Sequence, residues 1–141
     1  MIGRRSLLAA LLACAGTRLA AQQPDPLAGR FGGPFSLIAH DGRRVSDADF
    51  RGRFVLIYFG YTRCPDVCPI DLLTMGEALK KLGREADGIQ PLFITVDPAR
   101  DTKELLADYV TSFHPRLLGL TGSEAEVADA VRAWKIGRAH V

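Results

Sequence analysis

The sequence predicts an α/β domain that opens with a β-hairpin. Three observations lead to this fold class: apolar strand candidates alternate with amphipathic helix candidates, helix-start signals precede those helices, and a turn signal lies near the beginning. Strands that alternate with helices form parallel sheets with right-handed crossovers. In such sheets the functional loops gather at the carboxyl ends of the strands, so we expect the site at that edge.

The expected hairpin comes first. Residues 35–38 are a strand candidate, the run His40-Asp41-Gly42-Arg43 is a turn signal, and residues 44–45 begin the returning strand. Residues 46–50 then indicate a single helical turn. We interpret His40, beside Asp-Gly, as a solvated turn residue.

The stretch 54–82 carries the clearest chemistry. Phe54–Gly60 is an apolar run typical of a buried strand, and Pro69 suits the first position of the helix that follows. Cys64 and Cys68 lie on the loop between them. A helix N-terminus has unpaired N–H groups and stabilises a thiolate. We therefore expect Cys68, directly before Pro69, to be the more acidic thiol.

A pair of cysteines separated by three residues has several possible roles. The two sulfurs can face one point, where they either bond each other or hold a soft metal ion. A structural disulfide is the plainest alternative, but so short a loop gains little chain entropy from closure. The placement between strand and helix therefore favours a functional pair.

A second strand-helix unit follows. Residues 89–96 predict a buried strand, and Asp97 begins the loop at its end, on the same sheet edge as the cysteines. Asp101 and Glu104 have the spacing of a capping box for a helix over 102–113.

The third unit is shorter. Residues 117–120 predict a strand, and Ser123 with Glu126 forms a capping box for the last helix. His114 lies where the preceding helix ends and a positive charge is favourable, so it is interpreted as a helix-end residue, with a metal ligand as the alternative. The apolar positions expected to face the core are Leu72, Met75, Leu79, Leu82, Leu105, Leu106, Tyr109, Phe113, Val127, Ala130, Val131 and Trp134.

The segments before the domain indicate export. Residues 1–21 have a paired-arginine start and an Ala/Leu-rich segment too short to span a bilayer, as in a signal peptide. A lipobox ending at Cys14 is an alternative, which would leave a lipid-bearing N-terminus. Residues 22–33 are interpreted as a linker before a domain over 34–135. We expect the protein in the periplasm or on the outer face of the cytoplasmic membrane.

The charge balance does not indicate binding to nucleic acid. Three of the 18 basic residues lie in the leader, so the remainder nearly balances the 16 acidic residues. No basic run with interleaved aromatic residues is present, and nucleic acid is not an expected partner.

Three motifs occur in order along the domain: Gly-Tyr-Thr-Arg-Cys-Pro-Asp-Val-Cys-Pro (60–69), Phe-Ile-Thr-Val-Asp-Pro-Ala-Arg-Asp-Thr (93–102) and Gly-Leu-Thr-Gly (119–122). Together they resemble the Sco/SenC family of copper metallochaperones. The similarity that they belong to extends over nearly all of residues 34–134. The resemblance implies a thioredoxin-like fold and copper, as Cu(I) or Cu(II), bound by Cys64 and Cys68. Thiolates do select Cu(I), which agrees with the chemistry of the pair.

The resemblance also implies a role and partners. The family serves assembly of the dinuclear copper centre of cytochrome c oxidase, so the oxidase's copper-bearing subunit is the implied acceptor and another copper chaperone a possible donor. Asp66, between the cysteines, is implied to tune their acidity or mark a docking face, with an ordinary turn Asp as the alternative. Asp97 is implied to lie near the metal, with a capping or turn role as the alternative, and Arg100 is interpreted as a structural ion-pair partner.

One departure concerns the family's third ligand, a histidine on a hairpin after the last helix. This chain ends before that hairpin, and His140 lies in a polar tail over 136–141 that resembles translated sequencing adapter. We expect a truncated gene product that lacks the final hairpin, folds poorly and binds copper weakly.

Two other functions remain open. The same cysteines could serve an extracytoplasmic thiol-disulfide oxidoreductase, in which case the protein is an enzyme and not a binding module. A peroxiredoxin-type peroxidase has less support, because only Val67-Cys68-Pro69 is similar to that family's active site.

Overall fold

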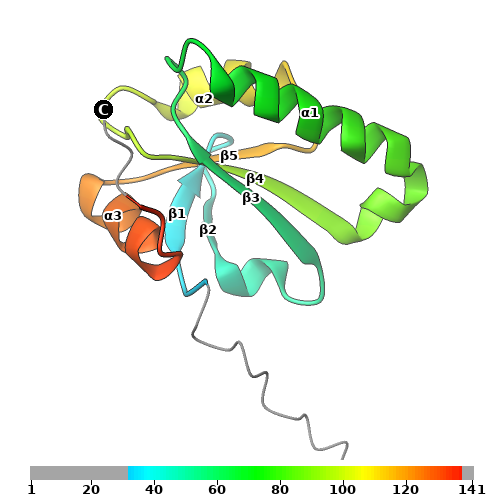
Figure 1. Cartoon of the computed structure of the whole chain (residues 1–141). Coiled ribbons are helices and arrows are strands. Elements are labelled where there is room, and N and C mark those ends of the chain that lie inside the picture. The colour runs from blue at the N-terminus through cyan, green and yellow to red at the C-terminus, as the bar shows by residue number, and fades with distance from the viewer. Residues whose placement is uncertain (1–31, 138–141) are drawn as a thin grey trace, which may run out of the picture.

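The computed structural model describes residues 32–137 and contains one five-stranded sheet in the order β2-β1-β5-β4-β3 (Figure 1). The strands are β1 (Ser36–Ala39), β2 (Arg44–Ser46), β3 (Phe54–Gly60), β4 (Ile89–Thr95) and β5 (Leu118–Thr121). The helices are α1 (Val67–Leu82), α2 (Lys103–Thr111) and α3 (Glu124–Ala133), with short 3-10 helices at Asp47–Phe50 and Gly83–Gly88. Strands β3, β4 and β5 are parallel, and β1 runs antiparallel to β2 and β5. The predicted α/β class and the hairpin are confirmed.

Both faces of the sheet are covered, which produces two apolar clusters (Figure 1). Side chains alternate along β4, so Leu92 and Ile94 pack with α3 on one face while Phe93 packs with α1 and α2 on the other. All three are fully buried. β4 is therefore the centre of the fold, and its carboxyl end fixes the place of the loops that follow β3 and β4.

The start of α3 confirms the predicted capping box. The hydroxyl of Ser123 accepts from the Glu126 N–H, and the Glu126 carboxylate accepts from the Ser123 N–H at 2.8 Å. Arg44 also donates to Glu126 at 2.8 Å, which ties β2 to α3. These contacts lower the pKa of Glu126 to about 2, chiefly through the Ser123 N–H.

The capping prediction for α2 is wrong. Thr102 is the N-cap residue and accepts from the Leu105 N–H at 3.3 Å, whereas Asp101 is fully buried. The predicted inward positions Leu105 and Leu82 are also wrong, since 39% and 42% of their surface is exposed. Leu106, which was also predicted to face inward, does face the sheet from α2. Leu82 is the last residue of α1.

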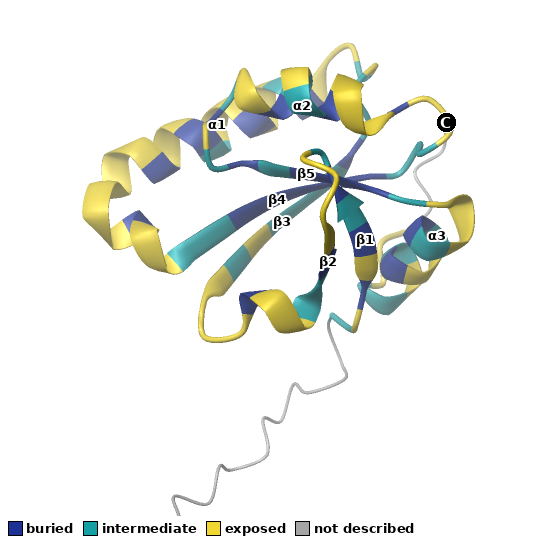
Figure 2. Ribbon diagram, turned by 180° about the vertical axis from the view of Figure 1, so that it is seen from behind, coloured by how far each residue is buried: buried dark blue, intermediate teal, exposed yellow. Residues whose placement is uncertain are grey.

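Strand β3 differs from its prediction as a buried strand. Within the described part of the chain it pairs with β4 alone, so one edge has no neighbouring strand. Phe54 is 79% exposed and Leu56 40% exposed. Figure 2 shows this exposure along the first half of β3. Its composition is that of a central strand, while its place among residues 32–137 is that of an edge.

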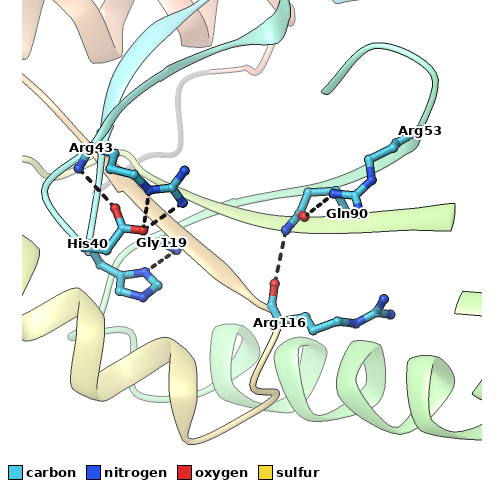
Figure 3. Close-up of polar contacts among 7 residues, drawn as sticks. His40, Arg43, Arg53, Gln90, Arg116 and Gly119 are labelled. Carbon is cyan, nitrogen blue, oxygen red and sulfur yellow. Dashed lines mark hydrogen bonds and ion pairs between the residues drawn. The ribbon is translucent and has the colours of Figure 1, made fainter. Parts of the chain in front are cut away.

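The two described histidines both accept hydrogen bonds from the backbone. The Nδ1 atom of His40 accepts from the Gly119 N–H at 3.0 Å, so His40 joins the hairpin to β5 and is not a solvated turn residue (Figure 3). His114 lies beyond the end of α2, where its Nδ1 accepts from the Arg116 N–H at 3.2 Å. Burial lowers the pKa of His114, so the expected positive charge at a helix end is wrong.

Gln90, near the start of β4, links the chain at the other end of the strands, away from the cysteines. Its amide accepts from Arg53 at 3.3 Å and donates to the Arg116 carbonyl at 3.1 Å (Figure 3).

None of the helices within residues 32–137 has the length and apolar character needed to cross a membrane.

Candidate thiol and metal site

The two cysteines lie at the junction of β3 and α1, on the predicted edge of the sheet. Cys64 is half-exposed on the connecting loop, and Cys68 is buried as the second residue of α1. Both line a cavity of about 680 Å³ together with Asp97. The helix begins at Val67 and not at Pro69 as predicted, so Pro69 occupies its third position.

The start of α1 acts on Cys64. The backbone N–H of Asp66, the thiol of Cys68 and the backbone N–H of Cys68 all hydrogen-bond the Cys64 sulfur and lower its pKa to about 7, with the Asp66 N–H having the largest effect. These N–H groups lie at the beginning of α1, where the helix has no acceptors of its own for them. Cys64 is therefore substantially a thiolate at neutral pH.

Cys68 has the opposite environment. Burial raises the pKa of its thiol, and its role as donor to Cys64 raises it further. The prediction that Cys68 is the more acidic cysteine is wrong. The physical reason is that α1 begins before Cys68, so its free N–H groups point at Cys64 while Cys68 packs inside the first turn.

Sequence reasoning missed the residues behind Cys68. A Cβ atom at Gly60 would lie 3.3 Å from the Cys68 sulfur, 2.8 Å from the Tyr58 ring and 3.0 Å from the Phe93 ring. Only glycine leaves space there. The Tyr58 hydroxyl donates to Asp71 at 3.0 Å and also contacts Cys68, and burial is the main reason that the pKa of Tyr58 is raised.

The two aspartates expected near the cysteines act in different ways. Asp66 is exposed and is the N-cap residue of α1, but its side chain makes no capping hydrogen bond; it reaches Cys64 through its backbone N–H. Asp97 lines the cavity, and its carboxylate accepts from Arg100 at 2.5 Å. The expected ion pair of Arg100 is thus present, and it occupies the Asp97 carboxylate.

Asp101, which the sequence predicted as a helix cap, is a buried residue that contacts the start of the cysteine loop. Its carboxylate accepts from the Thr62 N–H at 3.0 Å, the Thr62 hydroxyl at 2.6 Å and the Thr95 hydroxyl at 2.6 Å. An Asp directly before a helix has the same local pattern as a cap, so the sequence offers no signal for this tertiary role.

Two sulfurs are the metal-binding groups that the site brings together among the residues that the structure describes. Within residues 32–137 no group of three or more His, Cys, Asp or Glu side chains could hold a metal ion. His114 lies against Gly76, more than two turns along α1 from Cys68, and His140 lies outside the described residues. Two adjacent sulfurs can bind a soft ion or exchange with a disulfide.

Comparison with known proteins gives a consistent result. Residues 23–141 match the profile of the SCO1/SenC family. "Protein SCO2 homolog, mitochondrial" of Bos taurus is 51% identical over 106 residues, which are 74% of this chain and 40% of that protein. "Protein SCO1 homolog 1, mitochondrial" of Arabidopsis thaliana is 43% identical over 120 residues, 82% of this chain and 36% of that protein. The chain thus spans about two-fifths of the length of these curated relatives.

Solved structures agree in fold. Bradyrhizobium japonicum ScoI with copper bound is 44% identical, with a TM-score of 0.72 over 74% of this chain and 67% of that one. Yeast Sco1 with copper bound is 40% identical, with a TM-score of 0.72 over 79% of this chain and 64% of that one. The thioredoxin-like fold expected from the motifs is confirmed by these similarities.

Proposed function

Because the chain belongs to the SCO1/SenC family, we propose that it is a copper metallochaperone whose metal ligands are Cys64 and Cys68. One observation carries the proposal: the two thiols lie in hydrogen-bond contact and line one cavity, with Cys64 near its pKa at neutral pH. Relatives with the same fold are described with copper bound.

The chemistry of the pair suits a soft cargo ion. Thiolates select Cu(I), and Cys64 is available as a thiolate. Cys68 is protonated when free, so binding of Cu(I) releases its proton, and affinity rises with pH. A site with two sulfurs leaves coordination positions open on the solvent side, where donors of an acceptor protein can join before the ion leaves.

We assign the acceptor and the location on the same basis. The copper-bearing subunit of cytochrome c oxidase is the proposed acceptor, for assembly of its dinuclear copper site, and another copper chaperone is the proposed donor. Residues 1–21 are the proposed export signal and residues 22–33 the linker, which place the domain in the periplasm or on the outer face of the cytoplasmic membrane. Fractionation of cells that express the tagged chain tests this location.

An anaerobic titration of the reduced full chain with Cu(I) tests the metal proposal. The ultraviolet band from thiolate-to-copper charge transfer should saturate at one copper per chain. C64S and C68S should each abolish it. C14S makes the same atomic change at the one cysteine outside the domain and should leave the titration unchanged. A full titration curve from both C64S and C68S would refute the assignment.

Thiol-disulfide exchange is the second candidate, and the opposite pKa shifts of the two thiols favour it. The Cys64 thiolate would attack a partner disulfide and form a mixed disulfide, with one partner sulfur leaving as a thiol. Cys68 would then lose its proton and displace the second partner sulfur. The pair ends as a disulfide, and the partner gains two electrons and two protons. Rapid reduction of glutathione disulfide without Cu(I) binding would favour this candidate over the first.

A further inference from the structure

Asp101 connects the carboxyl ends of three neighbouring strands. Its carboxylate accepts from Thr62, which follows β3, and from Thr95, the last residue of β4. Its carbonyl accepts from the hydroxyl of Thr121, the last residue of β5, at 3.2 Å. One residue therefore contacts the last residues of β4 and β5 and the loop that follows β3, at the end of the sheet where the cysteines lie.

The Asp101 carboxylate is buried, so its hydrogen bonds are needed to keep it stable in the folded protein. Asp101 is 0% exposed, and no ion pair among residues 32–137 includes it. A buried carboxylate without a cation is unfavourable unless donors surround it. Here three donors converge on its two oxygens, two of them from Thr62. A carboxylate accepts at both oxygens, so it can hold all three, whereas an amide would offer one acceptor only.

The contact with Thr62 bears on Cys64 through the backbone. The Cys64 N–H donates to the Tyr61 carbonyl at 3.2 Å, which closes a turn over residues 61–64. Thr62 is the second residue of that turn, and both its N–H and its hydroxyl are held by Asp101. Because Thr62 is held in place, the turn has one orientation, and this orientation sets where Cys64 lies relative to the start of α1.

We propose that Asp101 is a positioning residue for Cys64: by holding Thr62, it places the Cys64 sulfur against the N–H groups of Asp66 and Cys68. Asp101 acts through the loop and touches neither sulfur. Its relevance to copper rests on the proposed function of the cysteine pair. The positioning itself is a property of the fold and can be measured without metal.

The test uses threonine variants, because D101A removes every donor's partner from a buried site and endangers folding. T62V removes the hydroxyl bond to the Asp101 carboxylate and keeps the shape of the side chain. T62S retains the hydroxyl and is the conservative rescue. T121V is the matched control, since it makes the same atomic change and removes a buried hydroxyl bond to the same residue. That bond goes to the Asp101 carbonyl and comes from β5, away from the cysteine loop.

Two readouts are compared in the full chain. Amide hydrogen exchange at Asp66 and Cys68, followed by NMR in the metal-free reduced protein, should become about tenfold faster in T62V. Competition for Cu(I) with a chromophoric chelator should show an affinity about tenfold weaker in T62V. T62S and T121V should match the unsubstituted chain in both readouts, although T121V loses comparable stability.

The outcomes separate the two proposals. Exchange at Asp66 and Cys68 that is the same in T62V and T121V would overturn the positioning role of Asp101. An unsubstituted chain that binds no Cu(I) would overturn the proposed function, while the exchange measurements would still decide the role of Asp101.

Discussion

Cys64 and Cys68 lie in hydrogen-bond contact, yet their pKa values move in opposite directions. Cys64 receives N–H groups from the start of α1, and Cys68 is desolvated inside the first turn of the same helix. The pair therefore contains one half-exposed cysteine with an acidic thiol and one buried cysteine whose thiol keeps its proton. This asymmetry is the basis of the chemistry proposed for the site.

Selective alkylation should reveal the asymmetry directly. With limiting iodoacetamide, Cys64 should be modified first, and its rate should reach half of its maximum near its pKa of about 7. Cys68 should react more slowly at every pH, because its thiol is buried and its pKa is raised. Peptide mass spectrometry of the reduced chain measures both rates. Faster labelling of Cys68 would contradict the assignment.

Gly60→Ala should damage both the fold and the site. The added Cβ would meet the Tyr58 and Phe93 rings at 2.8 and 3.0 Å, which requires both aromatic side chains to move. Overpacking of this kind costs roughly 1–3 kcal/mol, measured as the free energy of unfolding in urea. It should also weaken Cu(I) binding, because the same Cβ lies 3.3 Å from the Cys68 sulfur.

Gly88→Ala is the control for that substitution. No heavy atom lies within 4 Å of a Cβ added at Gly88, so the change should leave stability and Cu(I) binding near those of the unsubstituted chain. Equal effects of the two substitutions would show that the space around Gly60 does not matter.

Glu126 should make the fold sensitive to acid. Its folded pKa is about 2, below the ordinary value of 4.5, so the unfolded chain binds this proton more readily. The stabilisation is complete above pH 4.5 and is lost as the pH falls through about 2. In E126Q the melting temperature should be lower at neutral pH and should fall less over that acid range.

E124Q is the matched control for Glu126. It removes the same charge from the same turn of α3, but the Ser123 N–H and Arg44 contact Glu126. The acid profile of E124Q should therefore follow that of the unsubstituted chain. If E126Q and E124Q shift the profile equally, the capping contacts are not its cause.

Phe54 should promote self-association of the described domain. It is 79% exposed at the start of a strand with an open edge, and exposed apolar edges favour intermolecular pairing. F54S should lower light scattering on concentration and change the free energy of unfolding by less than about 0.5 kcal/mol. F93A replaces a fully buried phenylalanine and should cost about 3–5 kcal/mol instead. Unchanged scattering in F54S would remove Phe54 as the cause.

The sequence alone determined the order of elements, the hairpin, the cap of α3 and the place of the cysteines at the junction of β3 and α1. These follow from local spacing, turn residues and apolar period, which act over a few neighbours along the chain. The sequence also indicated that Arg100 takes part in an ion pair, and the structure shows that its partner is Asp97, three residues earlier.

Only the tertiary structure decided which thiol is acidic, which Asp is buried and which strand forms an edge. The acidity of Cys64 depends on where α1 begins, and the role of Asp101 depends on Thr62, which is 39 residues away along the chain. The exposure of β3 depends on the number of strands beside it. Burial and hydrogen bonding at these positions come from residues distant in sequence, so no local pattern could specify them.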